Sequence, residues 1–205
     1  RSEITGNPDS IKIRNQQIKT RGEDISFVLN QLEKMQSGFI SSNLKHKLNL
    51  NKVAVGGHSY GGATAILSAY RDKRIKSCFV LDGWINPVPN SIVKTGLNKP
   101  ALYVGRPTWQ DSDYPDNYFI LKRLISNSKS INYNLTIKNT LHLDYTDIPL
   151  YSPIIKYVMD VGNLSPKISQ PLINNLVHSF LETHLLNKND KVLMQNIKNK
   201  LITNS

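Results

Sequence analysis

The chain has 205 residues and a formal net charge of +11, with 39% apolar and 20% charged residues. This length and composition fit one globular domain with a sizeable core and exclude a disordered chain. No apolar run approaches eighteen residues, which excludes a bilayer-spanning helix. The lysines are scattered rather than gathered in blocks. We therefore expect a solvated basic surface first, contact with an anionic lipid surface second and nucleic-acid binding last.

The beginning of the chain and its cysteine content say little about compartment. The first ten residues are polar, do not begin with Met and lack the apolar stretch of a secretory signal, so a secreted and a cytoplasmic location both stay open. The single cysteine, Cys78, lies in an apolar run and is expected to be a buried structural thiol. No cluster of histidine and cysteine has the spacing of metal ligands, so we expect no metal and no cofactor.

The first half of the chain predicts a helix, a strand and a second helix. Apolar residues three and four positions apart predict an amphipathic helix over 21–36, with Glu23 and Asp24 in its favourable first turn. The apolar run 53–55 ends in two glycines, which is typical of a buried strand that stops at a turn. The small residues of 63–70 then predict a helix that packs closely on the sheet.

The alternation of strands and helices continues to near the end of the chain. We expect further elements at the strands 77–82 and 101–104, the helix 116–126, a less buried strand 131–137 near the sheet edge and a closing helix 170–186. Pro171 is expected near the first turn of that last helix, and 187–205 to form a polar, frayed tail. Strands that alternate with helices predict one α/β domain over 1–205 with a mostly parallel sheet.

The strongest chemical signal is the sequence G-H-S-Y-G at 57–61, between the strand 53–55 and the helix 63–70. In a nucleophile elbow, a serine on a strained strand-to-helix turn exposes its hydroxyl, and the flanking glycines avoid clashes with neighbouring backbone. Ser59 is therefore the expected nucleophile of an α/β-hydrolase fold. The backbone amide of Tyr60 is expected to stabilise the oxyanion, and His58 and Trp84 to lie at the oxyanion and substrate-binding site.

A serine nucleophile requires a general base, and the base requires an acid that holds its tautomer. His142 follows the strand 131–137 and so lies at the carboxyl edge of the sheet, together with Ser59. His58 lies inside the elbow and points the wrong way to act as the base, and the other histidines lie in a connector or on the closing helix. His142 is therefore the expected base.

Two positions are open for the acid. Asp82 closes an apolar run, where a carboxylate is costly unless it is paired. The alternatives follow the next strand, in a polar loop where solvated side chains are common; they are Asp111, Asp113 and Asp116. The order serine, aspartate, histidine along the chain holds for either choice.

Several of these segments resemble the platelet-activating factor acetylhydrolase family, the plasma and type II group. The likeness rests on G-H-S-Y-G-G-A-T at 57–64, L-D-G-W-I-N-P at 81–87, R-G-E-D at 21–24 and H-L-D-Y-T-D at 142–147, and covers about 20 to 186. In that family the acid lies on the strand after the elbow helix, so the resemblance favours Asp82. It implies a calcium-independent esterase that removes short sn-2 acyl chains from phospholipids, in the manner of a phospholipase A2.

One departure concerns the front of the domain. Only 58 residues precede Ser59, too few for the usual first strands and for the loop that carries a second oxyanion donor. We therefore expect the carboxyl-terminal, catalytic part of the fold, from a fragment or a truncated relative. Besides a serine esterase, two alternatives remain: an impaired remnant or interaction module, and an amide or peptide hydrolase with the same triad. Exposed apolar residues such as Ile85, Val88 and Ile92 are candidates for contact with a lipid surface.

Overall fold

A computed structural model describes residues 10–110, 112 and 114–204 of the chain. Its centre is one five-stranded sheet in which the strands follow the order of the sequence, β1-β2-β3-β4-β5. The first four strands run parallel and β5 runs antiparallel to β4. The strands are β1 (Val53–His58), β2 (Ile75–Leu81), β3 (Ala101–Gly105), β4 (Asn132–Ile137) and β5 (Ile202–Asn204).

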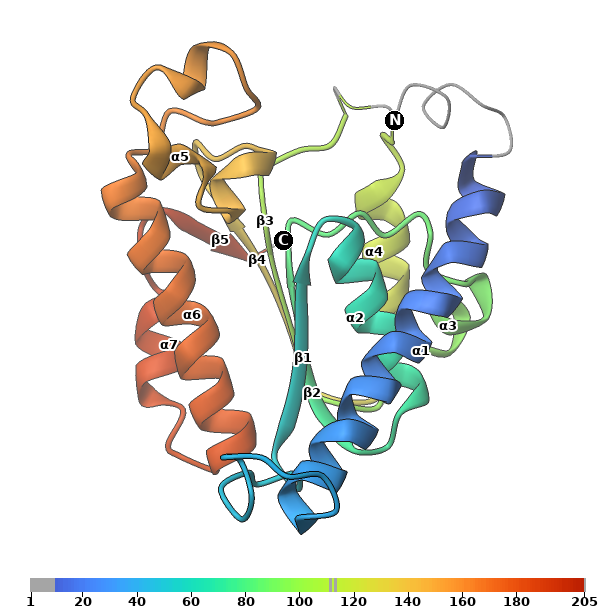
Figure 1. Ribbon diagram of the computed structural model, residues 1–205. Coiled ribbons are helices and arrows are strands. Elements are labelled where there is room, and N and C mark those ends of the chain that lie inside the picture. Colours follow the sequence, from blue (N-terminus) through green and yellow to red (C-terminus); the bar gives the residue numbers. More distant parts are fainter. Residues whose placement is uncertain (1–9, 111, 113, 205) are drawn as a thin grey trace.

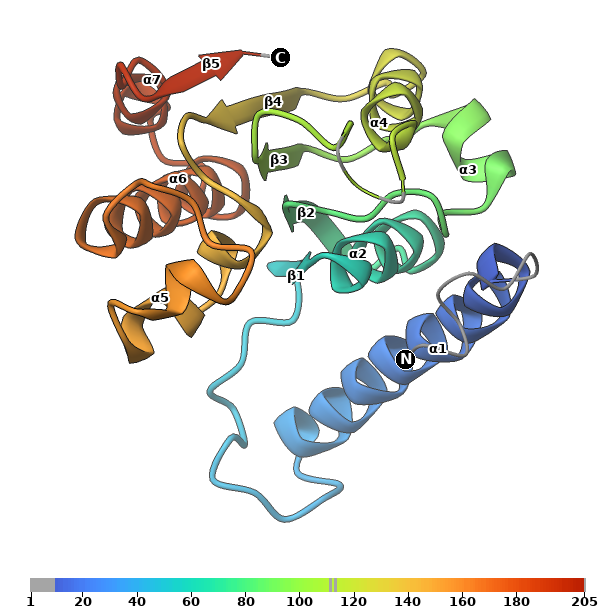
Figure 2. The ribbon, with the colours of Figure 1, turned by 90° about the horizontal axis from the view of Figure 1, so that it is seen from above.

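Helices cover both faces of the sheet (Figures 1 and 2). One face carries α1 (Ser10–Ser37), α2 (Tyr60–Arg71), α3 (Asn90–Thr95) and α4 (Asn117–Ser126), with α1 packed on α2 as an outer layer. The opposite face carries α6 (Pro166–Leu186) and α7 (Lys191–Ile197). Three short elements lie between β4 and α6, namely η1 (His142–Tyr145), α5 (Ile148–Tyr151) and η2 (Ile155–Tyr157).

The alternation of side chains along the strands divides the core into two halves. On β2, Cys78 and Val80 join the cluster under α1 to α4, whereas Phe79 packs against the cluster under α6 and α7. On β3, Tyr103 joins the first cluster and Leu102 the second. Successive side chains of a strand point to opposite faces, so near-continuous apolar strands are what a sheet covered on both faces requires.

The first helix begins earlier than predicted. It starts at Ser10 rather than at 21, so Glu23 and Asp24 lie in its middle and the prediction of an acidic first turn is wrong. The segment before 21 is mostly polar, but Ile18 is fully buried against α2 and its neighbours. Tertiary packing of this one apolar side chain extends the helix beyond the region where periodicity is visible.

The end of the chain also differs from the predictions. The closing helix begins at Pro166, which takes the first-turn position, and Pro171 lies inside the helix. The predicted frayed tail over 187–205 is wrong, because 191–204 contains α7 and β5. Leu193 and Ile202 are buried in the core cluster under α6. The strand predicted over 131–137 does lie near the edge of the sheet, because β4 is next to the edge strand β5.

The apolar residues that follow Asp82 are buried rather than exposed. Ile85, Val88 and Ile92 are between 0% and 5% exposed and belong to the cluster under α1 to α4. The prediction that these three residues contact a lipid surface is therefore wrong. Within the described residues, no helix is long and apolar enough to cross a bilayer.

Candidate active site

Ser59 lies between β1 and α2 in a strained backbone conformation. Its φ of 55° and ψ of −124° fall outside the regions that ordinary residues prefer. Backbone hydrogen bonds hold the turn: the Ser59 amide donates to the Leu81 carbonyl at 3.1 Å, and the Ser59 carbonyl accepts from Gly62 at 2.9 Å and Trp84 at 3.0 Å. The strand β2, the residue Trp84 after it and the start of α2 therefore fix Ser59 in place.

The glycines around the turn contribute unequally. A Cβ on Gly57 would lie 2.4 Å from the backbone carbonyl of Gly61, and a Cβ on Gly62 would lie 2.6 Å from Val80 Cγ1. A Cβ on Gly61 would meet no atom within 4 Å among the described residues. The prediction that both glycines of the motif are sterically required is therefore wrong for Gly61. The glycine of this helix start that has no room for a Cβ is Gly62, which packs against β2.

The three predicted catalytic side chains lie together at the carboxyl end of the sheet. His142 Nε2 lies 3.0 Å from Ser59 Oγ, and His142 Nδ1 lies 2.6 Å from Asp82 Oδ2. With its proton on Nδ1, the imidazole donates to Asp82 and accepts from the Ser59 hydroxyl. These contacts join residues 83 and 60 positions apart in the chain, and they have the geometry of a serine, histidine and aspartate triad.

The other candidates for the acid lie elsewhere. Asp111 and Asp113 fall outside the described residues. Asp116 precedes α4 as its N-cap residue and makes no capping hydrogen bond through its side chain. Asp82 itself is only 1% exposed and has a φ of 40°, so the backbone after β2 is strained where it presents the carboxylate.

The side chain of His58 forms its hydrogen bond with the backbone of His142 rather than with Ser59. Its Nε2–H donates to the backbone carbonyl of His142 at 2.9 Å, and the two ring centroids are 4.4 Å apart. Burial, and then the neighbouring His142, lower the pKa of His58 below its ordinary value. A neutral His58 can therefore donate this hydrogen bond at neutral pH while leaving Ser59 to His142.

Tyr60 and Trp84 place their side chains in the packing beneath the site. The Tyr60 hydroxyl donates to the Arg14 carbonyl at 2.7 Å, so this ring is directed toward α1. The Trp84 ring is 9% exposed and packs against Tyr114 and Tyr60, with ring centroids 4.5 and 5.7 Å away. Tyr60 opens α2, where the first backbone amides lack partners within the helix, so its amide remains the group available to an oxyanion.

Several supporting residues were missed by the sequence reasoning. The buried carboxylate of Asp144 accepts 2.7 Å hydrogen bonds from the amides of Leu141 and Gly162, which tie the histidine turn to the segment after it. Burial raises the pKa of Asp144. Arg106 and Trp109 follow β3 and enclose Asp82. Asp144 could have been suspected from its apolar flanks, whereas nothing in the local sequence distinguishes the buried Arg106 from the arginines at the surface.

Groups outside the triad form no second reactive centre in the part of the chain that is described. There, no three histidine, cysteine, aspartate or glutamate side chains are grouped as metal ligands. Cys78 is buried as predicted, and burial raises the pKa of its thiol to about 12. His178 is exposed near Glu182, and His184 contacts the Tyr133 hydroxyl at 3.2 Å.

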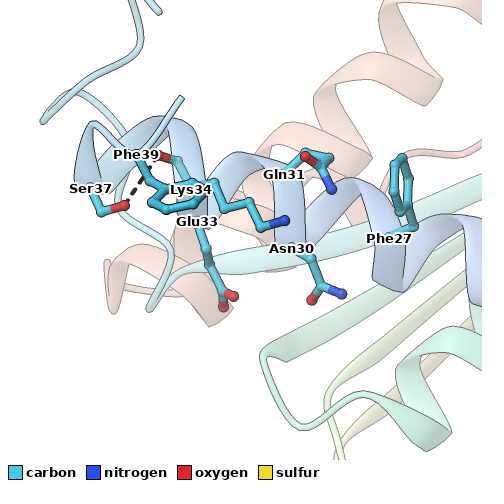
Figure 3. Close-up of a pocket in the computed structure, with 7 residues that line it drawn as sticks. All are labelled: Phe27, Asn30, Gln31, Glu33, Lys34, Ser37 and Phe39. Carbon is cyan, nitrogen blue, oxygen red and sulfur yellow. Dashed lines mark hydrogen bonds between the residues drawn. The ribbon is translucent and has the colours of Figure 1, made fainter. Parts of the chain in front are cut away.

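An open hollow of about 730 Å³ lies along α1, away from the triad residues (Figure 3). It is lined by Phe27, Asn30, Gln31, Glu33, Lys34, Ser37 and Phe39. Phe27 and Phe39 are 60% and 80% exposed, and the Lys34 ammonium lies 5.9 Å from the Phe39 ring centroid. The hollow contains none of the three triad residues, so we place the candidate active site at Ser59 and not here.

The sequence was compared with models of known protein families and with known proteins, and both comparisons found relatives. The model of "Platelet-activating factor acetylhydrolase, isoform II" matches residues 3–204, nearly the whole chain. The chain belongs to this family. Among curated relatives, the platelet-activating factor acetylhydrolase of Gallus gallus is 28% identical over 190 residues, and that of Canis lupus familiaris is 26% identical over 195 residues. These matches cover 87% and 89% of the chain but only 44% and 43% of the relatives.

A solved structure shows the same fold. A ferulic acid esterase from Streptomyces cinnamoneus matches with a TM-score of 0.71 and 24% sequence identity, over 88% of this chain and 52% of that one. At this identity the likeness concerns the fold alone. The platelet-activating factor acetylhydrolase family member described here therefore has an α/β-hydrolase fold, and it spans less than half the length of the curated relatives it matches.

Proposed function

We propose that the chain hydrolyses carboxylic esters through an acyl-enzyme on Ser59. The observation that carries this proposal is the continuous relay from Ser59 Oγ to His142 Nε2 at 3.0 Å and from His142 Nδ1 to Asp82 Oδ2 at 2.6 Å. Packing of unrelated side chains seldom produces two such contacts in the order that proton transfer requires. Membership of a family of acetylhydrolases supports the same conclusion.

The proposed reaction has two halves. Ser59 Oγ attacks the ester carbonyl carbon while its proton passes to His142 Nε2, and Asp82 stabilises the imidazolium. The charge on the carbonyl oxygen is stabilised by the Tyr60 amide at the start of α2. When the tetrahedral intermediate collapses, His142 returns the proton to the leaving alcohol. Water, activated by His142, then attacks the acyl-enzyme and releases the carboxylic acid.

For the substrate, we propose a short acyl ester of a phospholipid, as the resemblance to the plasma and type II enzymes implies. The relatives are named acetylhydrolases of platelet-activating factor, and the family model covers nearly the whole chain. The same resemblance implies that the reaction needs no calcium. An amide or peptide substrate is the competing possibility, and a comparison of matched acetyl ester and acetyl amide substrates distinguishes the two.

A lipid surface is the proposed setting of the reaction. The segment after His142 carries five apolar or aromatic side chains that are 57% to 77% exposed, which we call the apolar rim: Leu150, Tyr151, Ile154, Tyr157 and Val158. Lys156 lies among them, with its ammonium 5.0 Å from the Tyr157 ring centroid. Exposed aromatic and aliphatic side chains beside a lysine suit the boundary between water and lipid. Figure 1 shows α5 near the end of the sheet where β4 finishes.

Covalent labelling tests the chemistry. A fluorophosphonate probe should add once to the parent chain, as read by intact mass, and not to Ser59→Ala. His142→Gln should abolish labelling, whereas the matched control His178→Gln, at an exposed histidine on α6, should leave it unchanged. A folded parent that takes no probe would contradict the proposal and favour the impaired remnant.

Vesicle sedimentation tests the lipid surface. The triple variant Tyr151→Ser, Tyr157→Ser and Val158→Ser should lose binding to phosphatidylcholine vesicles while keeping its rate on soluble p-nitrophenyl acetate. Phe119→Ser on α4 is the matched control, because Phe119 is 69% exposed but lies outside the apolar rim. Equal binding by the triple variant and the parent would contradict a role for the rim.

A further inference from the structure

We propose that Arg106 is a positioning residue of the site, acting on His142 through Asp82; this inference rests on the proposed esterase function. It starts from the surroundings of the Asp82 carboxylate, whose side chain is fully buried. Oδ1 accepts hydrogen bonds from the Arg106 backbone amide at 3.0 Å and from Trp109 Nε1 at 3.3 Å. Oδ2, the oxygen that accepts from His142, lies 3.4 Å from Arg106 Nε.

Arg106 is itself held from several directions. Its Nη1 donates to Asp160 Oδ2 at 3.1 Å, and its guanidinium lies 4.2 Å from the Trp109 ring centroid. Its backbone carbonyl accepts a hydrogen bond from the Tyr118 hydroxyl. The residue is only 9% exposed, and a cation at that depth is costly unless it faces an anion. Among the described residues it faces two anions, Asp82 and Asp160.

Asp160 connects this arginine to the turn that carries His142. While its side chain pairs with Arg106, its backbone carbonyl accepts a 2.9 Å hydrogen bond from the amide of Leu143. Leu143 directly follows His142 in η1. Arg106 therefore contacts the acid of the triad on one side and, through Asp160, the backbone beside the base on the other.

This arrangement explains how a fully buried carboxylate can hold the imidazole. A carboxylate in the interior is costly unless a charge faces it, and a general base carries no positive charge until it takes the proton from the nucleophile. Arg106 supplies a permanent positive charge at the oxygen shared with His142. The guanidinium faces that oxygen at 3.4 Å as a charge rather than through a hydrogen bond, which favours the arrangement with the proton on Nδ1 and with Nε2 facing Ser59 as an acceptor.

The experiment compares charge with packing at position 106. On p-nitrophenyl acetate, Arg106→Met keeps the volume and loses the charge, and kcat should fall by about 10- to 100-fold with KM within about twofold. That loss is smaller than the roughly 10⁴-fold lost when the triad acid of a serine protease becomes an amide. Arg106→Lys keeps the charge and should recover most of kcat. Asp160→Asn should lower kcat by a smaller factor, because Asp82 still faces the arginine.

Arg74→Met is the matched control. Arg74 is also an arginine paired with two carboxylates, Asp72 and Glu33, but it lies in the turn before β2, at the opposite end of that strand from Asp82. This variant should lower thermal stability and leave kcat unchanged for the folded fraction, which circular dichroism and active-site titration with the fluorophosphonate measure.

Two outcomes would overturn the role of Arg106. One is a kcat of Arg106→Met within twofold of the parent; the other is a loss that simply follows the folded fraction or that Arg106→Lys does not restore. An inactive, unlabelled parent would overturn the proposed function and this role with it. An active parent with an unaffected Arg106→Met overturns the role alone, so the two failures are distinguishable.

Discussion

Alanine at Gly61 and alanine at Gly62 should have opposite effects on stability, although the two glycines are neighbours in the elbow. A Cβ on Gly62 would lie 2.6 Å from Val80 Cγ1 and 3.2 Å from Gly83 Cα, whereas a Cβ on Gly61 meets nothing within 4 Å. Carbon atoms in contact prefer about 3.5–4.0 Å, so Gly62→Ala must displace β2 or the loop after it by about an ångström.

The magnitude follows from these distances. Forcing one extra carbon into a packed site costs about 1–3 kcal/mol, so Gly62→Ala should lower the free energy of unfolding by that amount. Gly61 lies in α2 with an ordinary helical φ, where alanine is favoured over glycine by about 0.5–1 kcal/mol. The two variants should therefore differ by about 1.5–4 kcal/mol.

Urea unfolding monitored by circular dichroism measures both variants against the parent, with the slope on urea checked for constancy. A double-mutant cycle identifies the cause, because Val80→Ala removes the atom that the new Cβ on residue 62 meets. The variant that combines Gly62→Ala with Val80→Ala should therefore lose less free energy of unfolding than the two single variants added together. Equal effects of alanine at 61 and 62, or strict additivity with Val80→Ala, would refute the steric reasoning.

Three further predictions concern stability and reactivity away from the site. The hydrogen bond from Arg74 lowers the pKa of Asp72 from 3.8 to about 2. The ionised Asp72 therefore stabilises the folded chain fully above about pH 4, and this contribution is lost as the pH falls through about 2. In urea unfolding, the difference in the free energy of unfolding between the parent and Asp72→Asn should therefore narrow as the pH falls. A difference that stays constant would contradict this. Because Cys78 is buried and its pKa is raised to about 12, Ellman's reagent at pH 8 should react with it only in denaturant; rapid reaction of the folded chain would show an opening that the fold does not have. Leu193→Ala should lower the free energy of unfolding by about 2–5 kcal/mol, because this side chain of α7 is fully buried. Val192 is its exposed neighbour, and Val192→Ala should lower the free energy of unfolding by less than about 0.5 kcal/mol. Equal losses for the two variants would mean that α7 does not pack as described.

The elbow and the two elements around it were predictable because the signal is local. An apolar strand, a tight turn and a run of small residues lie next to one another in the chain, and each limits what the next can be. The nomination of His142 required only the rule that the carboxyl ends of parallel strands share one edge. The choice of Asp82 over the later aspartates rested on the resemblance to relatives, because physical reasoning alone left both open.

Elements that depend on tertiary contacts were not predictable in the same way. The beginning of α1 is mostly polar, and α7 and β5 lie in a segment rich in lysine and asparagine. Each is held by a few buried side chains such as Ile18, Leu193 and Ile202. Arg106 and Asp160 are 54 positions apart, so no window of sequence contains their contact. Ile85 and Val88 were assigned to the surface because a loop was expected there, and a loop can be buried when α3 and α4 cover it.

The strand that leads into Ser59, β1, is one of the two edge strands of the described sheet. Among the described residues, β1 pairs with β2 alone, and its six residues include no charged side chain and no proline. Such a strand has no built-in barrier against the backbone of another extended segment. Any segment that pairs there would run beside the turn at Ser59, where the strained φ and the bond to His142 are set. We therefore expect association along this edge to change the rate at which a fluorophosphonate labels Ser59.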